Sequence, residues 1–304
     1  MKTLIVCSKN SGKIAPFILD QTESLKLKSV EIDFFTISGK GLSGYLKSRK
    51  SLLQKIKEFQ PDIIHAHYGL SGLLANLQRR VPVVTTYHGS DINNRKVLIF
   101  SKIAIFLSKF NIFVSQKNIE IAKPKRNFAL IPCGVDTELF KPLDKVECRT
   151  KLGFSEKKQL VLFSGSFDNK VKNADLAQKA VSQLKDVKLI ELKGYTRQEV
   201  ASLMNAVDAV LMTSHSEGSP QFIKEAMATN CPIVSVDAGD VREVLGDTKN
   251  CFICERSENK IAEALQQVLK TNKRTSGREK ILNFGNKTVV KKIIDVYKSI
   301  INGK

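Results

Sequence analysis

Glu217 and Glu225 stand eight positions apart, on either side of an expected helix start. Ser219 is a residue type that often caps a helix, and Pro220 is favoured as the first helical residue. Glu217 is therefore expected on the loop before the helix and Glu225 inside it. Because the first N–H groups of a helix are unpaired and attract anions, this stretch could bind a sugar nucleotide.

Each part of this stretch has an expected role. Glu225 would accept hydrogen bonds from the ribose hydroxyls, and Glu217 would accept them from hydroxyls of the donor sugar. The backbone between them would lie against sugar and phosphate, with an N–H donor from each residue except the proline: Gly218, Ser219, Pro220 and Gln221. The alternative interpretation is a solvated loop acid followed by an acid on a surface helix.

The flanking segments favour the functional interpretation. Residues 209–212 are an apolar run that predicts a buried strand, and residues 231–236 predict a second strand. Residues 237–240 then form a loop at the carboxyl end of that second strand. Ligands of open α/β sheets bind at the carboxyl ends of parallel strands, where these acids would lie.

This block resembles the donor-binding motif of the family 4 retaining glycosyltransferases, whose pattern of two acids separated by seven residues falls on Glu217 and Glu225. Within that family the chain looks most similar to enzymes that build cell-surface polysaccharides such as teichuronic acid. The resemblance extends over nearly the whole chain, and its other marks are residues 61–67, 86–91, 131–136 and 163–166. It implies the GT-B fold, in which two Rossmann-like parallel-sheet domains face each other across a cleft.

The resemblance also implies cations for the leaving diphosphate, and here the chain departs from the family. The usual Gly-Arg after the first strand of the second domain is replaced by Gly165 and Ser166, and a serine brings no charge. The usual lysine has two candidates, Lys170 and Lys172, of which we choose Lys172 because it directly precedes the next helix. Pyrophosphate stabilisation would then depend more on this lysine and on the helix dipole.

In the first domain the resemblance assigns His88 to the donor sugar. Asp91 would bind hydroxyls of the acceptor or of the sugar, and Gly12, in the first strand–helix turn, would approach phosphate or acceptor. His65 and His67 point to the same side of a strand end, but without a third ligand they do not predict a metal site.

The resemblance implies a retaining, metal-independent transfer of a hexosyl group from a nucleotide sugar, with UDP expected as the nucleotide. Such enzymes are thought to react from the front face, so that the departing phosphate takes the acceptor's proton and no side chain must act as base. The Asp-x-Asp pair of metal-dependent transferases is absent from the sequence. We therefore expect neither a metal nor another cofactor.

Composition fits two soluble α/β domains. The 304 residues are 42% hydrophobic and 26% charged, and strand and helix patterns alternate through both halves. We expect an acceptor-side domain over residues 1–142, a donor-side domain over residues 143–286 that begins with a polar linker, and a C-terminal helix over residues 287–304 that packs back on the first domain.

A net charge of +19 predicts an anionic partner. Aromatic residues make up 7% of the chain and Trp is absent, so no stacking platform for nucleic acid is evident. Arg95, Lys102 and Lys109 recur every seven residues beside apolar neighbours, which predicts a helix that lies on anionic lipid; the alternative is a solvated face over a buried one.

We expect a cytoplasmic protein, because residues 97–114 are too interrupted to span a bilayer and no leader pattern precedes the first strand. We also expect peripheral membrane contact and a glycan or lipid-linked acceptor.

Three other functions compete with a transferase. A catalytically silent GT-B protein that binds nucleotide sugar and regulates a partner would explain Ser166, but not the retained Glu217, Glu225 and His88. A nucleic-acid-binding protein would explain the charge but leave the paired acids without a role. A GT-B sugar-nucleotide epimerase shares the fold, yet the Glu-Gly-Ser-Pro helix start fits the transferases better.

Overall fold

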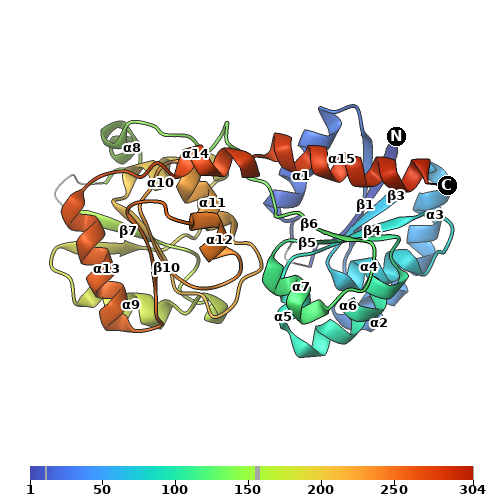
Figure 1. The fold of residues 1–304 in the computed structure, drawn as a ribbon, viewed down its shortest axis with the longest axis horizontal. Coiled ribbons are helices and arrows are strands. Elements are labelled where there is room, and N and C mark those ends of the chain that lie inside the picture. The colour runs from blue at the N-terminus through green and yellow to red at the C-terminus, as the bar shows by residue number, and fades with distance from the viewer. Residues whose placement is uncertain (11, 155–157, 304) are drawn as a thin grey trace. The chain divides into compact units, whose positions relative to one another are not determined.

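The computed structural model describes residues 1–10, 12–154 and 158–303, which form two units. Unit 1 comprises residues 1–134 and 286–304, and unit 2 comprises residues 135–285 (Figure 1). Each unit alternates strands with helices around one parallel sheet, as the sequence predicts.

The sheet of unit 1 has the order β2-β1-β3-β4-β5-β6, with every neighbouring pair parallel. Its strands are β1 (Lys2–Ser8), β2 (Glu31–Ile37), β3 (Ile63–His67), β4 (Val83–Tyr87), β5 (Phe110–Phe113) and β6 (Phe128–Leu130). Its helices are α1 (Pro16–Lys26), α2 (Gly41–Lys47), α3 (Arg49–Phe59), α4 (Gly69–Asn76), α5 (Ser90–Asn93), α6 (Arg95–Leu107), α7 (Gln116–Ala122) and α15 (Asn286–Asn302).

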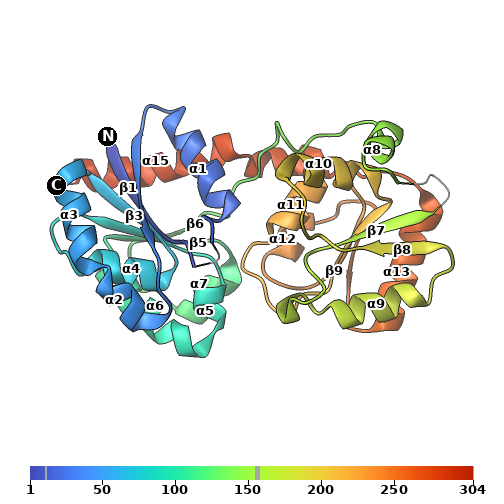
Figure 2. The ribbon, with the colours of Figure 1, turned by 180° about the vertical axis from the view of Figure 1, so that it is seen from behind.

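Both faces of this sheet are covered, since successive residues of a strand point to opposite sides. In β3, Ile63 packs in the core that α1 and α15 cover, whereas Ile64 packs with Leu74 of α4 on the other face. α6 lies against the outer side of α4. The layers are visible in Figure 2, seen from behind.

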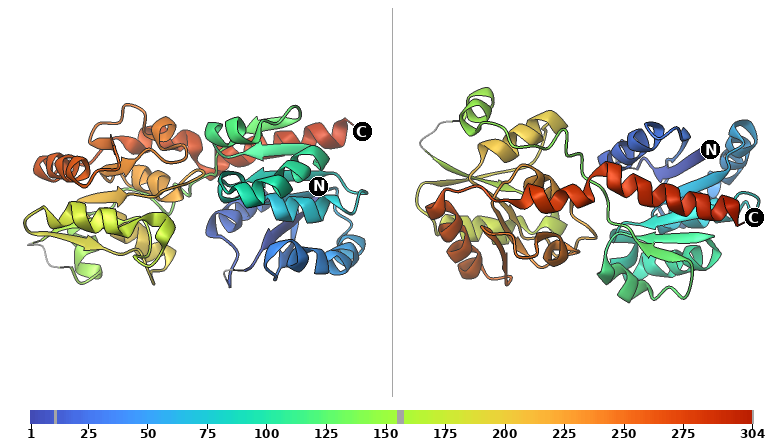
Figure 3. Two further views of the ribbon diagram at one scale, coloured as in Figure 1. Left: turned by 90° about the horizontal axis from the view of Figure 1, so that it is seen from below. Right: turned by 45° about the horizontal axis from the view of Figure 1, so that its top comes forward.

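α15 packs on unit 1, as the sequence predicts, and runs along one face of its sheet (Figure 3). Val289, Ile293, Val296 and Ile300 recur at helical spacing and are all buried. The hydroxyl of the buried Tyr297 lies 2.5 Å from Nδ1 of His65 in β3. The helix is therefore held by an apolar stripe and by one buried polar contact.

The sheet of unit 2 has the order β11-β10-β9-β7-β8 and is also parallel throughout. Its strands are β7 (Gln159–Phe163), β8 (Val187–Ile190), β9 (Ala209–Met212), β10 (Ile233–Val236) and β11 (Cys251–Cys254). Its helices are α8 (Lys145–Lys151), α9 (Ala174–Ser182), α10 (Arg197–Ala206), α11 (Gln221–Ala228), α12 (Val241–Leu245), α13 (Glu258–Thr271) and α14 (Gly277–Ile281), with 3-10 turns η1 (Lys170–Lys172) and η2 (Leu282–Phe284). α9 and α13 pack together, as do α8 with α10 and α11 with α14.

The chain crosses from unit 1 to unit 2 after Gly134, eight residues before the boundary expected from the sequence. The Val135 N–H donates to the carbonyl of Phe284 at 3.0 Å, and Phe140 is fully buried in the core of unit 2. The Arg278 guanidinium also donates to the carbonyls of Thr137 and Phe140. Residues 135–142 therefore pack with the second unit, because Phe140 anchors them there.

Candidate functional site

The sheet of unit 2 changes direction of winding between β7 and β9. β8 lies on one side of β7, and the chain then crosses to place β9 on the other side. The loops after β7 and β9 consequently leave the same edge of the sheet next to each other, where ligands of doubly wound sheets bind. These loops carry residues 164–173 and 213–220.

Lys172 and Glu217, predicted separately from the sequence, form an ion pair at this edge. Lys172 Nζ lies 2.7 Å from Glu217 Oε1, and the two side chains are only 22% and 15% exposed. The lysine is positioned by its own turn, because Thr213 Oγ1 donates to the Lys172 carbonyl and the His215 N–H to that of Val171. Lys170, the other candidate, is exposed, which favours the choice of Lys172.

Glu225 lies in the second turn of α11 and is buried, 9% exposed. Its Oε1 lies 3.5 Å from an Nη of Arg197, the first residue of α10. The Arg197 guanidinium also stacks over the ring of Phe140 at 5.2 Å. Arg197 gives no signal in the sequence, because it lies 28 positions before its acidic partner.

The helix after Glu217 begins one residue later than predicted. α11 starts at Gln221 with Pro220 as its N-cap, and no side chain caps it. Ser219 does not cap the helix, because its hydroxyl donates to Asp240 Oδ2 at 2.5 Å and accepts a hydrogen bond from Lys224 Nζ. Lys224 is wholly buried and lies 3.8 Å from Asp240. A buried lysine thus ties the predicted donor loop to the loop after β10.

Gly218 and Gly239 explain how closely these two loops approach. A Cβ at Gly239 would lie 2.6 Å from the carbonyl oxygen of Gly218, and Gly239 has a φ of +66° that disfavours other residues. The loops after β9 and β10 therefore meet backbone to backbone. Close by, the buried side-chain amide nitrogen of Gln221, at the start of α11, has no hydrogen-bond partner.

Ser166 stands where the resembled family carries an arginine, and Asp168 links it to a cation from the loop after β8. Its hydroxyl donates to Asp168 Oδ1, and Lys193 Nζ lies 2.9 Å from Asp168 Oδ2. The hydrogen bonds from Ser166 and Lys193 lower the pKa of the Asp168 carboxyl. Lys193 follows β8 and was missed in the sequence, where it is one lysine among many.

Unit 1 has a cavity of about 420 Å³ at the carboxyl ends of its strands. It lies where the order of the sheet reverses, between β1 and β3, and is lined in part by Lys13, Tyr45, Tyr68 and Asp91. Gly12, predicted in the first turn, has a φ of +86° and donates its N–H to the Lys9 carbonyl. A glycine is required there by backbone conformation, and its approach to a ligand stays a prediction.

Asp91 is buried, 3% exposed, and its carboxylate is already engaged. It accepts hydrogen bonds from the backbone N–H groups of Gly69, His88 and Gly89 at 2.9 to 3.0 Å. Burial raises the pKa of its carboxyl to about 6 despite these bonds. Asp91 thus positions the turn at the end of β4, and its predicted contact with hydroxyls stays a prediction.

His88 is half-buried in a cluster of rings at the same edge. Its Nε2 lies 3.0 Å from Nδ1 of His67, and its Nδ1 lies 3.4 Å from Sγ of Cys133. The rings of Phe17 and Tyr68 pack against it at 4.7 and 4.6 Å. Both ring nitrogens of His88 therefore have neighbours within unit 1.

The histidines of β3 are buried, and burial disfavours their charged forms. Burial lowers the pKa of His65 to about 3, and burial together with the neighbouring histidines lowers that of His67 well below its usual value. His65 lies between Tyr297 and Thr86, with Nε2 2.7 Å from the threonine hydroxyl. Over the described ranges, no three His, Cys, Asp or Glu side chains gather as metal ligands.

Two parallel Rossmann-like units, each with a polar site where its sheet reverses, define the GT-B class of fold. Residues 19–139 match the family model Glycosyltransferase Family 4, and residues 168–271 match Glycosyl transferases group 1. The chain therefore carries a Glycosyltransferase Family 4 domain followed by a group 1 glycosyltransferase domain.

Among relatives, the chain is 25% identical over 242 residues to the teichuronic acid biosynthesis glycosyltransferase TuaC of Bacillus subtilis (strain 168). This match covers 69% of this chain and 62% of that protein. It is 24% identical over 268 residues to D-inositol 3-phosphate glycosyltransferase of Mycobacterium marinum, covering 71% and 57%. The chain thus spans about three fifths of the length of these curated relatives.

Solved structures show the same fold over nearly the full chain. Anabaena Alr3699/HepE in complex with UDP-glucose has a TM-score of 0.77 at 18% identity and covers 98% of this chain and 100% of its own. Sucrose-phosphate synthase from Thermosynechococcus elongatus has a TM-score of 0.88 at 16% identity and covers 100% of both. At these identities the similarity shows the fold alone.

Proposed function

We propose that this protein is a retaining glycosyltransferase that moves a hexosyl group from a nucleotide sugar, with UDP as the nucleotide, to a glycan or lipid-linked acceptor in cell-surface polysaccharide synthesis. The matches to two glycosyltransferase family models support the transfer reaction. The name of the TuaC relative supports a surface polysaccharide, and the UDP and UDP-glucose complexes of HepE support the nucleotide.

The observation that carries this proposal is the pair of partly buried ion pairs at the donor edge of unit 2. Lys172–Glu217 and Arg197–Glu225 hold charged groups in place before any ligand arrives. A nucleotide diphosphate would take Lys172 as a counter-cation and leave Glu217 to accept hydrogen bonds from sugar hydroxyls. Glu225 would accept hydrogen bonds from the ribose hydroxyls.

The chemistry we propose needs no side-chain base and no metal. As the bond from the anomeric carbon to the diphosphate breaks, negative charge grows on the leaving phosphate, where Lys172 stabilises it. That phosphate oxygen then takes the proton of the acceptor hydroxyl, which attacks from the same face. Lys193, held by Asp168, brings a second cation to the edge that lacks the family's arginine.

The cavity of unit 1 is the proposed acceptor site. Tyr45 and Tyr68 offer ring faces and polar hydroxyls of the kind that contact sugars, and Lys13 adds a donor. A contact of His88 with the donor sugar also stays part of the proposal. For this contact, a ring nitrogen of His88 would have to leave its neighbour, His67 or Cys133, and form a hydrogen bond with a sugar hydroxyl instead.

A second candidate function is the catalytically silent nucleotide-sugar-binding regulator, which Ser166 in place of arginine favours. For either function we propose peripheral contact with an anionic membrane. Within the described part of the chain, no helix has the length and hydropathy to cross a bilayer.

Calorimetric titration with UDP, GDP and ADP, without added metal, tests the donor site. We expect one nucleotide to bind with micromolar affinity and Glu225→Ala to weaken that binding at least about tenfold, because a buried acceptor pair for ribose is lost. Lys172→Ala should lower turnover more than affinity. Glu263→Ala, which removes an exposed glutamate from α13, is the matched control.

The outcomes separate the two functions. Binding together with transfer to a glycan acceptor supports the transferase, and binding without transfer to any acceptor supports the silent regulator. Failure of all three nucleotides to bind would contradict both functions as proposed for these nucleotides.

A further inference from the structure

α6 presents an apolar stripe to solvent. Ile99, Ile103 and Phe106 are 61%, 44% and 75% exposed, and their spacing of four and three residues places them on one face. The opposite face, with Ser101 and Ala104, is buried against the rest of unit 1. Single exposed apolar residues are ordinary, but a continuous stripe marks a surface that is covered in use.

Phe106 lies between two adjoining hollows, which share Phe106 and Arg126 in their linings. The first hollow has a volume of about 540 Å³ and is also lined by Lys102 of α6 and by Lys123 and Lys125 of the segment after α7. The second, of about 450 Å³, is formed at the amino-terminal edge of β4 and β5.

The charges of this surface have one sign. Arg79, Arg80 and Lys109 line the second hollow, so seven cations in all surround Phe106, and neither hollow has an acidic residue in its lining. The sequence from Ile92 to Ile119 contains no Asp or Glu. The side chains that line the two hollows therefore supply no counter-charge for these cations.

We propose that this surface docks unit 1 on an anionic phospholipid bilayer. The headgroup phosphates would occupy the two hollows, and Phe106, Ile103 and Ile99 would enter the boundary between headgroups and acyl chains. A helix with an apolar face and flanking basic residues binds membranes in this orientation. The proposal deepens the membrane contact proposed above and does not depend on sugar transfer.

Other occupants account for only part of the surface. A soluble anion or a nucleic acid would neutralise the cations but leave the stripe of Ile99, Ile103 and Phe106 in water. A second copy of the chain would cover the stripe but bring two sets of seven cations face to face. An anionic bilayer covers the stripe and neutralises the cations together.

The same helix reaches the acceptor cavity. Val97, in the first turn of α6, lines the cavity of unit 1 together with Ser90 and Asp91. A bilayer under α6 would therefore lie along the element that runs from the basic hollows to that cavity. This placement suits an acceptor that is attached to a lipid.

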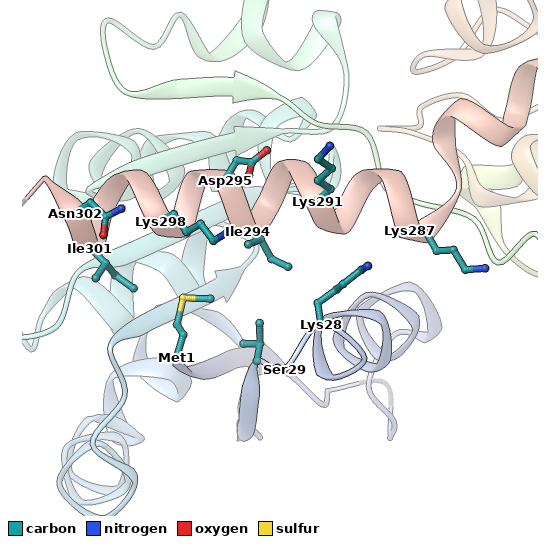
Figure 4. A pocket seen from close by; sticks show the side chains of 11 residues that line it. Met1, Lys28, Ser29, Lys287, Lys291, Ile294, Asp295, Lys298, Ile301 and Asn302 are labelled. Atoms are coloured by element: carbon teal, nitrogen blue, oxygen red, sulfur yellow. The ribbon is translucent and has the colours of Figure 1, made fainter.

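A second lysine-rich groove in unit 1 offers a matched control. It lies between α15 and the end of α1, has a volume of about 510 Å³ and is lined by Lys28, Lys291 and Lys298 (Figure 4). Unlike the hollows beside Phe106, its lining includes an acid, Asp295.

The test is flotation with vesicles of phosphatidylglycerol and phosphatidylcholine, or of phosphatidylcholine alone, at about 0.15 M salt. We expect binding only to the anionic vesicles. The triple variant Lys123→Gln, Lys125→Gln, Arg126→Gln should lower the partition coefficient roughly 100-fold, because each basic residue near the surface contributes about fivefold. Phe106→Ser should lower it roughly tenfold, because an inserted ring is lost.

The control triple variant Lys28→Gln, Lys291→Gln, Lys298→Gln removes the same charge and should retain most binding. Equal loss in both triple variants, or no binding to anionic vesicles, would overturn the proposal. So would tight RNA binding, or a dimer in light scattering that Phe106→Ser dissociates. All changed side chains are exposed, and nucleotide titration of each variant should match the parent, which separates failure here from failure of the donor site.

Discussion

The carboxyl edges of the two sheets differ in how many charged side chains they hold in ion pairs. The edge of unit 2 holds three ion pairs with buried or half-buried members, Lys172–Glu217, Arg197–Glu225 and Lys224–Asp240. The edge of unit 1 holds His65 and His67, whose pKa values burial lowers, and the Asp91 carboxylate, which accepts hydrogen bonds from three backbone N–H groups. Both edges occupy the same place in the same type of sheet.

This difference follows from what each edge would have to bind. A diphosphate carries charge that must be neutralised as the leaving group departs, and charged side chains placed in advance do so without rearrangement. A sugar hydroxyl carries no charge and is bound by neutral polar groups and ring faces. The contrast is what the proposed placement of the nucleotide in unit 2 would require, and the changes below test it.

The largest effect is expected from Glu217→Ala. Loss of its hydrogen bonds to the donor sugar, together with the loss of order at Lys172, should lower the rate of transfer about 100- to 1000-fold. The variant should remain folded, because Glu217 lies on a loop. Single-turnover kinetics with saturating donor measures the rate, and Glu217→Gln shows how much of the loss belongs to the charge. A rate within about twofold of the parent would remove Glu217 from the site.

Lys224→Met tests whether the buried pair supports the donor loop. Removing one partner leaves the Asp240 carboxylate unpaired in the interior, which costs about 3 kcal/mol of unfolding free energy. Burial already raises the pKa of that carboxyl. Urea unfolding measures the loss, and the double variant Lys224→Met, Asp240→Asn should recover most of it. If the double variant is stable yet binds nucleotide weakly, the network positions Ser219 and the donor loop.

Much of this edge was predictable because its signals are local. Strand, turn and helix follow each other around Glu217, and Lys172 forms an ion pair with it. The role of Lys172 as the phosphate lysine stays a prediction. The contact between these two residues across 45 positions follows from the switch between β7 and β9, which all doubly wound sheets share. The alternation of strands and helices in both units was predictable for the same reason.

The missed residues have no local signal. Lys224 has the sequence context of a surface lysine, and only the folded loop after β10 shows that it is wholly buried beside Asp240. The same network takes the hydroxyl of Ser219 away from the helix start, so the capping prediction was wrong. Residues 145–151 form α8 where a polar linker was expected. Asp144 caps this helix, and Arg149 ties it to the distant Asp208.

The neutral edge of unit 1 should respond to acid. Because burial lowers the pKa of His65 to about 3 from 6.5, the unfolded chain takes the proton first as pH falls. The stability that depends on neutral His65 is complete above pH 6.5 and declines below it by up to about 1.4 kcal/mol per pH unit. Asp91 works in the opposite direction, since its raised pKa favours the folded state as pH falls from about 6.

Comparison with His65→Gln isolates this effect from that of Asp91. The difference in unfolding free energy between parent and variant should narrow by about 1.7 kcal/mol between pH 6.5 and pH 5. Denaturant titrations at several pH values measure it, with His215→Gln, a change to an exposed histidine of unit 2, as the control. A constant difference would mean that His65 has the same pKa in the folded and unfolded chain, so that burial does not keep it neutral as the pH falls.

The smallest effect is expected at Lys193, which would extend the charged edge of unit 2 beyond its three ion pairs. Lys193 is exposed, and Asp168 neutralises part of its charge, so Lys193→Gln should lower the transfer rate only severalfold, about the effect of an exposed charge. Adding Ser166→Arg to this variant should restore the rate, because it supplies a cation at the position where the family carries one. Lys260→Gln on α13 is the control for net charge. Restoration of the rate would show that Lys193, after β8, supplies the second cation that the family carries after β7. An unchanged rate in Lys193→Gln would leave Lys172 as the cation on which the reaction depends.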